Sequence, residues 1–271
     1  MRRALVALLL IAACSTIASA QQYTYYFPHI ASGFGSALSW KTTIFISNSS
    51  ASFASGSITF TDVNGGPFNV AFIDDVARPI GGGNAIPFQL GPGETRKYES
   101  VVNGPLMTGF ATVTANAAVL GTAMFTQYDA NGRMLGEAGV PAAIPLGKQA
   151  IFVDTTGGYK TGVAIANPNT AALHIHFELV NTMGQVVAAM TRDLPPFQQF
   201  SIFIHELFPA APGMVGRLQF WCTNPMTAIG LRFDPSGALF TTLPPIAIAG
   251  LIQPAVRWEI PGIVRRERLL S

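Results

Sequence analysis

The amino-acid sequence predicts an all-β protein built from two tandem β-sandwiches. Three observations support this fold class: short segments in which polar and apolar residues alternate, turn-forming clusters between them, and a weak internal repeat. Charged residues make up only 11% of the chain and hydrophobic residues 49%. Soluble domains carry roughly 25% charged residues, so this composition disfavours long solvated helices and charged disordered segments.

The first twenty residues are typical of a secretory signal peptide. Arg2 and Arg3 form a positive start, Ala4–Ala13 is an apolar run, and Ala18–Ala20 is a small-residue cleavage site. A bilayer span takes about 20 apolar residues, so this run is too short to be one. A second interpretation is a bacterial lipobox, in which Cys14 is lipidated. The chain is therefore predicted to be secreted or periplasmic, in the cell envelope, with lipoprotein anchoring through Cys14 as the alternative.

The charge balance and cysteine content of the rest of the chain limit the kinds of partner it could bind. Without the signal peptide, basic and acidic residues balance, so the chain has no basic face of the kind that nucleic acid binding requires. No later segment reaches membrane-spanning length. Cys14 and Cys222 are the only cysteines, and removal of the first leaves no internal disulfide. We expect an unknown protein or glycan partner, with no nucleic acid and no transmembrane segment beyond the signal peptide.

An internal repeat defines the predicted domains. Trp40–Ser49 matches Tyr159–Pro168, and the same order of matches continues to the turns Asp129–Gly132 and Asp234–Gly237. The offset shortens along the chain because the first copy has a longer middle loop, 74–85. The predicted divisions are a signal peptide (1–20), a first sandwich (23–145), a second sandwich (146–250) and a C-terminal tail (251–271).

Each copy contains strand-like segments at the spacing of a sandwich. Clusters such as Asp62–Gly65 separate them as turns, because Asn-Gly tolerates the backbone angles that tight hairpins need. A helical turn is predicted only at Ile204–Phe208. The clearest strands are Thr42–Ser47, Ser57–Thr61, Phe110–Ala115 and Thr122–Tyr128 in the first copy, and Thr161–Ala166, Leu173–Leu179, Arg217–Cys222 and Ala228–Phe233 in the second.

Several segments together resemble a repeat found in many exported bacterial proteins: Tyr26–Gly33, Trp40–Thr43, Gly157–Pro168, Gly230–Phe233 and Leu243–Pro245. The resemblance runs from Tyr23 to about Ile246. Those uncharacterised proteins carry tandem immunoglobulin-like sandwiches, so the resemblance implies two tandem immunoglobulin-like β-sandwich domains after a signal peptide. The family has no established activity, and the resemblance carries no functional residues over to this chain.

One predicted strand holds three residues that could bind a metal ion. His174, His176 and Glu178 share one face, because side chains alternate along a strand. Imidazole and carboxylate groups suit zinc or copper. The alternative is that the apolar residues of Leu173–Leu179 face the core and the polar face is merely solvated. The matching segment of the first copy, Ser55–Thr59, has no metal-binding side chains there.

Three aromatic residues are candidates for ligand contact. Trp221 points outward if its neighbours Phe220 and Cys222 point inward, and an outward Trp could stack on a sugar ring or fill an interface. Trp40 and Tyr159 occupy equivalent places in the two copies. The alternative for Trp221 is a contact between the domains or partial cover by a neighbouring loop, and the equivalence of Trp40 and Tyr159 favours a shared packing role. The inward phase of Cys222 predicts a small buried thiol.

Catalytic motifs are incomplete in this sequence. His205-Glu206 begins like a zinc-protease motif but lacks the second His, and no Gly-x-Ser-x-Gly elbow occurs. We therefore predict no enzyme, no catalytic residues and no cofactor. The predicted function is an exported, non-enzymatic module for cell-surface or extracellular adhesion, scaffolding or ligand contact. The alternatives are a periplasmic chaperone-like protein that caps a partner's strand, and a hydrolase with a loop-built site.

Overall fold

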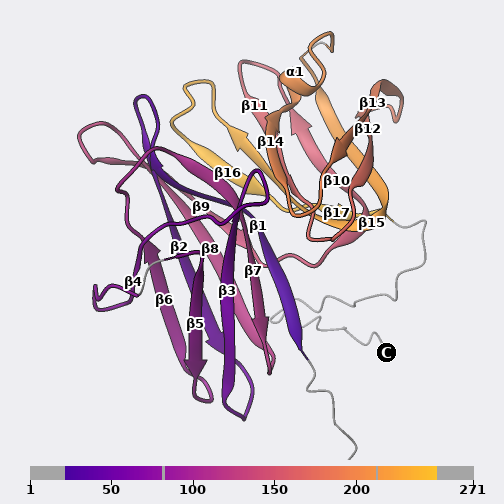
Figure 1. The fold of residues 1–271 in the computed structure, drawn as a ribbon. Helices are drawn as coiled ribbons and strands as arrows, with labels where there is room; N and C mark the ends of the chain where they lie inside the picture. Colours follow the sequence, from indigo (N-terminus) through magenta and orange to yellow (C-terminus); the bar gives the residue numbers. More distant parts are fainter. Residues whose placement is uncertain (1–21, 81–82, 212, 249–271) are drawn as a thin grey trace, which may run out of the picture. The chain divides into compact units, whose positions relative to one another are not determined.

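A computed structural model describes residues 22–80, 83–211 and 213–248 (Figure 1). The predicted signal peptide, Cys14 and the tail 251–271 lie outside these residues. The described chain is all-β, with a single four-residue helix. No helix within it is long and apolar enough to cross a membrane. Its contacts divide it into unit 1, which ends at Ile144, and unit 2, which begins at Pro145.

Unit 1 is an antiparallel assembly with two sets of paired strands. Sheet A has the order β5–β3–β7–β1, and sheet B contains β4, β6, β2, β8 and β9. The end of β1 links the sheets, because Gly33 of β1 pairs with Trp40 of β2. The strands are β1 (Tyr23–Phe34), β2 (Ser39–Asn48), β3 (Ala54–Asp62), β4 (Phe72–Ile73), β5 (Ala85–Leu90), β6 (Thr95–Ser100), β7 (Met107–Ala115), β8 (Val119–Tyr128) and β9 (Met134–Pro141).

The core of unit 1 comes from the alternating side chains of both sheets. Ile58 and Phe60 of β3 are fully buried, and so is Ile44 of β2. The ring of Phe60 stacks on that of Phe72 in β4, with centroids 4.7 Å apart, and so connects sheet A to sheet B. Each such side chain contributes about 1.5–3 kcal/mol through burial, which selects the register that turns the apolar face inward.

Unit 2 repeats this plan. Sheet C has the order β13–β12–β15–β10–β17, and sheet D contains β14, β11, β15 and β16. The ring contact between Phe177 of sheet C and Phe200 of sheet D, at 6.3 Å, lies in the shared core. The elements are β10 (Leu146–Asp154), β11 (Lys160–Ala166), β12 (Leu173–Asn181), β13 (Val186–Leu194), β14 (Gln199–Phe203), α1 (Ile204–Leu207), β15 (Val215–Phe233), β16 (Phe240–Leu243) and β17 (Ile246–Ala247). Both units are consistent with β-sandwiches.

One expectation about the strands is wrong. The sequence predicts separate strands at 217–222 and 228–233, whereas β15 runs unbroken from Val215 to Phe233. Its first half pairs with β10 and β12, and its second half with β11 and β16. Pro225 cannot donate a backbone hydrogen bond, but it lies where the strand changes partners, and its carbonyl accepts a bond from Asn169 Nδ2 at 2.8 Å.

Each unit contains a buried asparagine, at equivalent positions, whose side chain bonds a strand end to the neighbouring loops. Asn48 Nδ2 donates to the carbonyls of Ser52, Leu90 and Gly91 at 2.7–3.1 Å. The same three hydrogen bonds occur in unit 2, where Asn167 Nδ2 donates to the carbonyls of Ala171, Leu194 and Pro195 at 2.8–3.1 Å. Both side chains are fully buried, and each Oδ1 accepts the backbone N–H two residues on.

Each unit also contains one buried threonine whose hydroxyl makes two hydrogen bonds with the same backbone residue. Thr42 Oγ1 donates to the carbonyl of Ala31 at 2.7 Å and accepts the N–H of the same residue at 3.0 Å. Thr161 makes the equivalent two bonds with Asp154, at 2.9 and 3.1 Å. The positions aligned by the internal repeat therefore carry the same internal hydrogen bonds in both units.

Candidate functional site

The outer surface of sheet C carries most of the candidate residues. Leu218, Phe220 and Cys222 of β15 point into the core, so Trp221 points outward, as the alternation of a strand requires. We call this surface the sheet C face and define it by the outward side chains of three adjacent strands: His174, His176 and Glu178 of β12, Arg217, Gln219 and Trp221 of β15, and Lys148 and Phe152 of β10.

A row of three side chains crosses the middle of this face. Trp221 pairs in register with His176 on one side and with Lys148 on the other. The imidazole of His176 stacks on the indole at 5.5 Å and 12°, and Lys148 Nζ lies 5.0 Å from the ring centroid. Because β12 and β10 flank β15 on opposite sides, the two contacts occupy opposite faces of the indole. A sugar ring could stack on Trp221 only if one neighbour moved aside.

The three predicted metal ligands lie on this face, each with a partner. His174 Nδ1 lies 2.6 Å from Asp193 Oδ1, while Glu178 accepts a short hydrogen bond from Gln219. The rings of His174 and His176 meet edge to face at 5.2 Å. Among the described residues, no three His, Cys, Asp or Glu side chains form a group that could hold a metal ion. Metal binding here stays a prediction, to be checked by zinc titration of the protein and of His176→Ala.

An apolar shelf borders the row at the edge of sheet C. We define it as Phe152, Ile246 and Ile248, which line a hollow of about 230 Å³ together with Arg217 and Gln219. Phe152 is 62% exposed and Ile246 is 50% exposed. Exposed apolar side chains that adjoin one another mark contact sites more often than scattered ones do.

Unit 1 carries a different surface on the same strand positions. The register Ser57–Thr114–Thr24 across β3, β7 and β1 corresponds to His176–Trp221–Lys148 in unit 2. Ser55 and Thr59 stand at the positions of His174 and Glu178. The frame is shared, but only the copy in unit 2 presents an aromatic ring and ionisable groups at these places.

The structure does not bring Trp40 and Tyr159 into this row. Trp40 is half-buried in β2 of unit 1, in register with Gln127 of β8. Tyr159 precedes β11 in unit 2, and the Arg232 guanidinium lies 3.7 Å from its ring centroid. Arg232 also bonds Asp154 at 2.5 Å, and this bond lowers the pKa of that carboxyl. Both aromatic residues thus have packing partners within their own units.

Cys222 is the free thiol among the described residues. It is buried beside Met226, and its Sγ donates to the carbonyl of Asn224 at 2.7 Å. Burial raises the pKa of the Cys222 thiol to about 11, and the hydrogen bond opposes this only in part.

We expect Cys222 to be nearly inert in the folded chain. In a Cys14→Ser variant at pH 8, alkylation by iodoacetamide should run about 100-fold slower in native protein than in urea, because the thiolate is the reactive form. The rate follows from mass spectrometry of timed samples. Equal rates in the two conditions would contradict the burial of this thiol.

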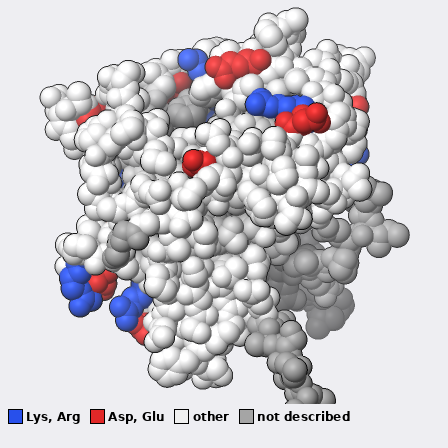
Figure 2. All heavy atoms as spheres, in the orientation of Figure 1, with Lys and Arg blue, Asp and Glu red and all other residues white. Residues whose placement is uncertain are grey.

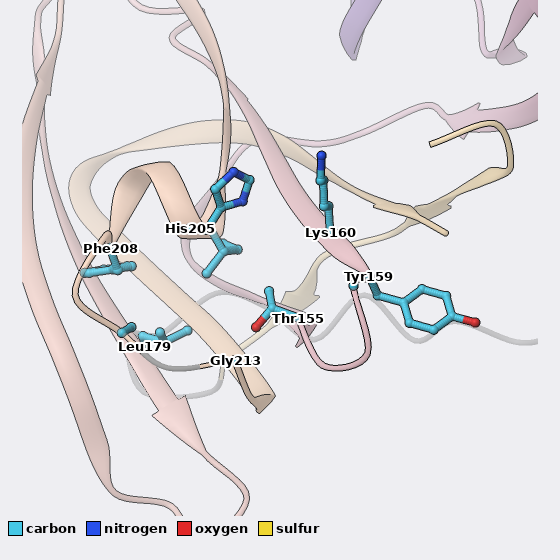
Figure 3. Close-up of a pocket in the computed structure, with 10 residues that line it drawn as sticks. Thr155, Tyr159, Lys160, Leu179, His205, Phe208 and Gly213 are labelled. Atoms are coloured by element: carbon cyan, nitrogen blue, oxygen red, sulfur yellow. The ribbon is translucent and has the colours of Figure 1, made fainter. Parts of the chain in front are cut away.

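A second hollow lies at one end of unit 2, and the sequence does not reveal it. This end pocket, of about 280 Å³, lies between the β10–β11 turn and the segment that contains α1 (Figure 3). Its lining residues are Thr155, Gly158, Tyr159, Lys160, Leu179, Ile204, His205, Phe208, Ala211 and Gly213. They come from three separate stretches of the chain, so no motif or spacing could have indicated it.

Charged side chains elsewhere on the described surface are few and mostly paired. On the face drawn in Figure 2, Lys and Arg residues lie beside Asp or Glu, and most of the surface is uncharged. Lys41 pairs with Glu99 at 2.9 Å and Arg96 with Glu94 at 2.5 Å. Such exposed pairs contribute about 0–1 kcal/mol each and leave few charged groups free for ligand binding.

Comparisons with known proteins assign no family to the chain. No family model matches it, and no curated protein matches it. The grounds for a functional proposal are therefore the surfaces described above. The sheet C face combines outward-facing aromatic, cationic and apolar groups on one layer, and the end pocket adds a separate hollow.

Proposed function

We propose that this chain is an exported, non-enzymatic binding module made of two immunoglobulin-like sandwiches. It contacts a protein or glycan partner through the sheet C face, at the cell surface or outside the cell. One observation carries the proposal: His176, Trp221 and Lys148 stand in unit 2 where unit 1 has small hydroxyl residues on the same strand frame.

The chemistry of this face suits contact with a partner. Trp and Arg are over-represented among residues that dominate binding energy, and Trp221 and Arg217 both lie on β15. Phe152 and Ile246 keep apolar surface in water, and a partner that covered them would gain from their burial. The strands hold these side chains in fixed register, so binding would cost little further conformational entropy.

The arrangement of ionisable groups supports a non-enzymatic role. His174 and Asp193 form a pair that resembles part of a catalytic relay, but their side chains are 61% and 76% exposed. Catalytic carboxylate–imidazole pairs are usually buried, where hydrogen bonds and low dielectric orient the ring. In water-exposed form the pair is better suited to surface recognition.

Export is part of the proposal. It rests on the signal-like segment Met1–Ala20 and on the resemblance to exported bacterial repeat proteins. Anchoring through Cys14 remains the alternative route to the envelope. Mass spectrometry of the processed N-terminus distinguishes the two, because cleavage after Ala20 removes Cys14.

Substitutions on the sheet C face should weaken partner binding. We expect Trp221→Ala or Phe152→Ser to reduce retention on the partner, with a loss of about 2 kcal/mol, or roughly 30-fold in Kd. The partner is sought on panels of envelope polysaccharides and purified envelope proteins. Leu120→Ser is the matched control for Phe152→Ser, because Leu120 of unit 1 is also 62% exposed. Thr114→Ala is the control for Trp221→Ala.

Two results would count against this proposal. Equal binding by wild type, Trp221→Ala and Phe152→Ser would remove the sheet C face as the contact surface. Turnover of a substrate by the purified chain in a hydrolase panel, lost in His174→Ala, would favour the enzymatic alternative.

A specific observation favours strand capping as the second candidate function. β17 pairs with β10 only at Gln149 and Ala150, which leaves the Phe152 end of this edge unpaired in the described chain. An extended segment of a partner could add there beside the apolar shelf. Binding of unfolded envelope peptides, without binding of glycans, and location in the soluble periplasm would support this role over adhesion.

A further inference from the structure

The end pocket is built by a segment that unit 1 lacks. Residues 204–214 connect β14 to β15 in unit 2, whereas the shorter segment 101–106 connects β6 to β7 in unit 1. In unit 2 the longer segment forms α1 and returns to the sheet at Met214. Thr155 holds the return in place, since its N–H donates to the Met214 carbonyl at 2.9 Å and its Oγ1 accepts the Met214 N–H at 3.0 Å.

The floor of the end pocket is apolar. Leu179 of β12, Ile204 of α1 and Phe208 just after α1 are buried members of the unit 2 core, and they also line the pocket. The hollow therefore reaches the core at the open end of the sandwich. An apolar group placed there would replace water against these three side chains.

The rim of the pocket carries one lysine and one histidine. Figure 3 shows the side chains of Lys160 and His205 rising on the same side of the pocket, while the Tyr159 ring points away from it. No acidic side chain in the described chain forms an ion pair with Lys160. The neighbouring acid Glu206 accepts the Phe203 N–H at 3.0 Å. A negative group at the rim would meet a lysine that forms no ion pair with any residue the structure describes.

We propose that the end pocket binds a small organic anion, a carboxylate on a short aliphatic chain. The chain would lie against Leu179, Ile204 and Phe208, and the carboxylate would accept hydrogen bonds from Lys160 and His205. A volume of about 280 Å³ is near the lower end for ligand pockets, so the ligand is smaller than a drug-sized molecule. This site is separate from the sheet C face and does not depend on the function proposed for that face.

Hexanoate is a suitable probe of both halves of the site. Titration into the full chain, followed by amide and methyl NMR shifts, should move the signals of Leu179, Ile204 and Phe208. Hexanol keeps the apolar chain without the charge, and acetate keeps the charge without the chain. We expect each to bind at least about 10-fold more weakly than hexanoate, because each loses one of the two contacts.

Two lysine variants distinguish hexanoate binding at this pocket from non-specific attraction of the anion to any lysine of the protein. Lys160→Gln should weaken hexanoate binding about 10-fold or more, while Lys148→Gln, the same charge change on the sheet C face, should leave it unchanged. Lys160 is exposed, so its replacement should not disturb folding, which the unperturbed NMR spectrum outside the pocket verifies.

Three outcomes would overturn the proposal: hexanol binding as tightly as hexanoate, equal loss in both lysine variants, or shifts that do not map to the pocket floor. None of these outcomes bears on the sheet C face. Equally, a failure of Trp221→Ala to change partner binding leaves the hexanoate result standing.

Discussion

Replacing Asn167 with Ala is expected to lower the free energy of unfolding of unit 2 by about 3 kcal/mol. The side chain is fully buried, and its amide donates to the carbonyls of Ala171, Leu194 and Pro195. Alanine would leave these carbonyls and the Asn169 N–H without their partner, in a space that water cannot easily enter. Urea unfolding, followed by a signal from each unit, measures the loss.

The repeat supplies a matched test of this expectation. Asn48→Ala should destabilise unit 1 by a similar amount, because Asn48 makes the same set of bonds there. Asn131→Ala is the control, since Asn131 is exposed in a turn and should change the free energy by less than about 0.5 kcal/mol. A loss below about 1 kcal/mol for both buried sites would show that the loops do not depend on these asparagines.

The second large effect is expected from a methyl group at Gly216. A Cβ there would lie 2.1 Å from the carbonyl oxygen of Val180, a backbone atom on the paired strand β12. Gly216→Ala must push β15 away from β12 at the Asn181–Gly216 pair, which we expect to cost about 3 kcal/mol. Thermal unfolding should therefore shift clearly downward.

Gly109 is the equivalent position in unit 1, where a Cβ would lie 2.0 Å from the Thr61 carbonyl oxygen. Gly109→Ala should match the effect of Gly216→Ala. Gly139→Ala is the control, because nothing lies within 4 Å of a Cβ at that strand position. If Gly139→Ala were as destabilising as the other two, a general effect of alanine in these strands would explain all three, and the close approach would not.

Much of the secondary structure could be predicted from local patterns. The alternation in Leu173–Leu179 indicates both the strand and the direction of each side chain, because a strand has a period of two. The matching order of Trp40–Ser49 and Tyr159–Pro168 locates Asn48 and Asn167 at equivalent places. Local sequence is sufficient for the strand and its side-chain directions, and comparison of the two copies is sufficient for the equivalent asparagines.

The row on the sheet C face was beyond such reasoning. Trp221 is outward by alternation, but its contacts with His176 and Lys148 depend on the register of three strands that are distant in the sequence. The continuity of β15 also depends on strands that pair with it from both sheets. The end pocket requires the return of 204–214 to Thr155, which a one-sequence pattern does not encode.

The course of β15 has a mechanical consequence. One half of this strand is bonded into sheet C and the other into sheet D, so the backbone itself ties the two layers together. A pull applied to the sheet C face through Trp221 would be transmitted along covalent bonds to the opposite layer. Neither layer could peel away while β15 stayed extended, and unit 2 should yield to tension in one step.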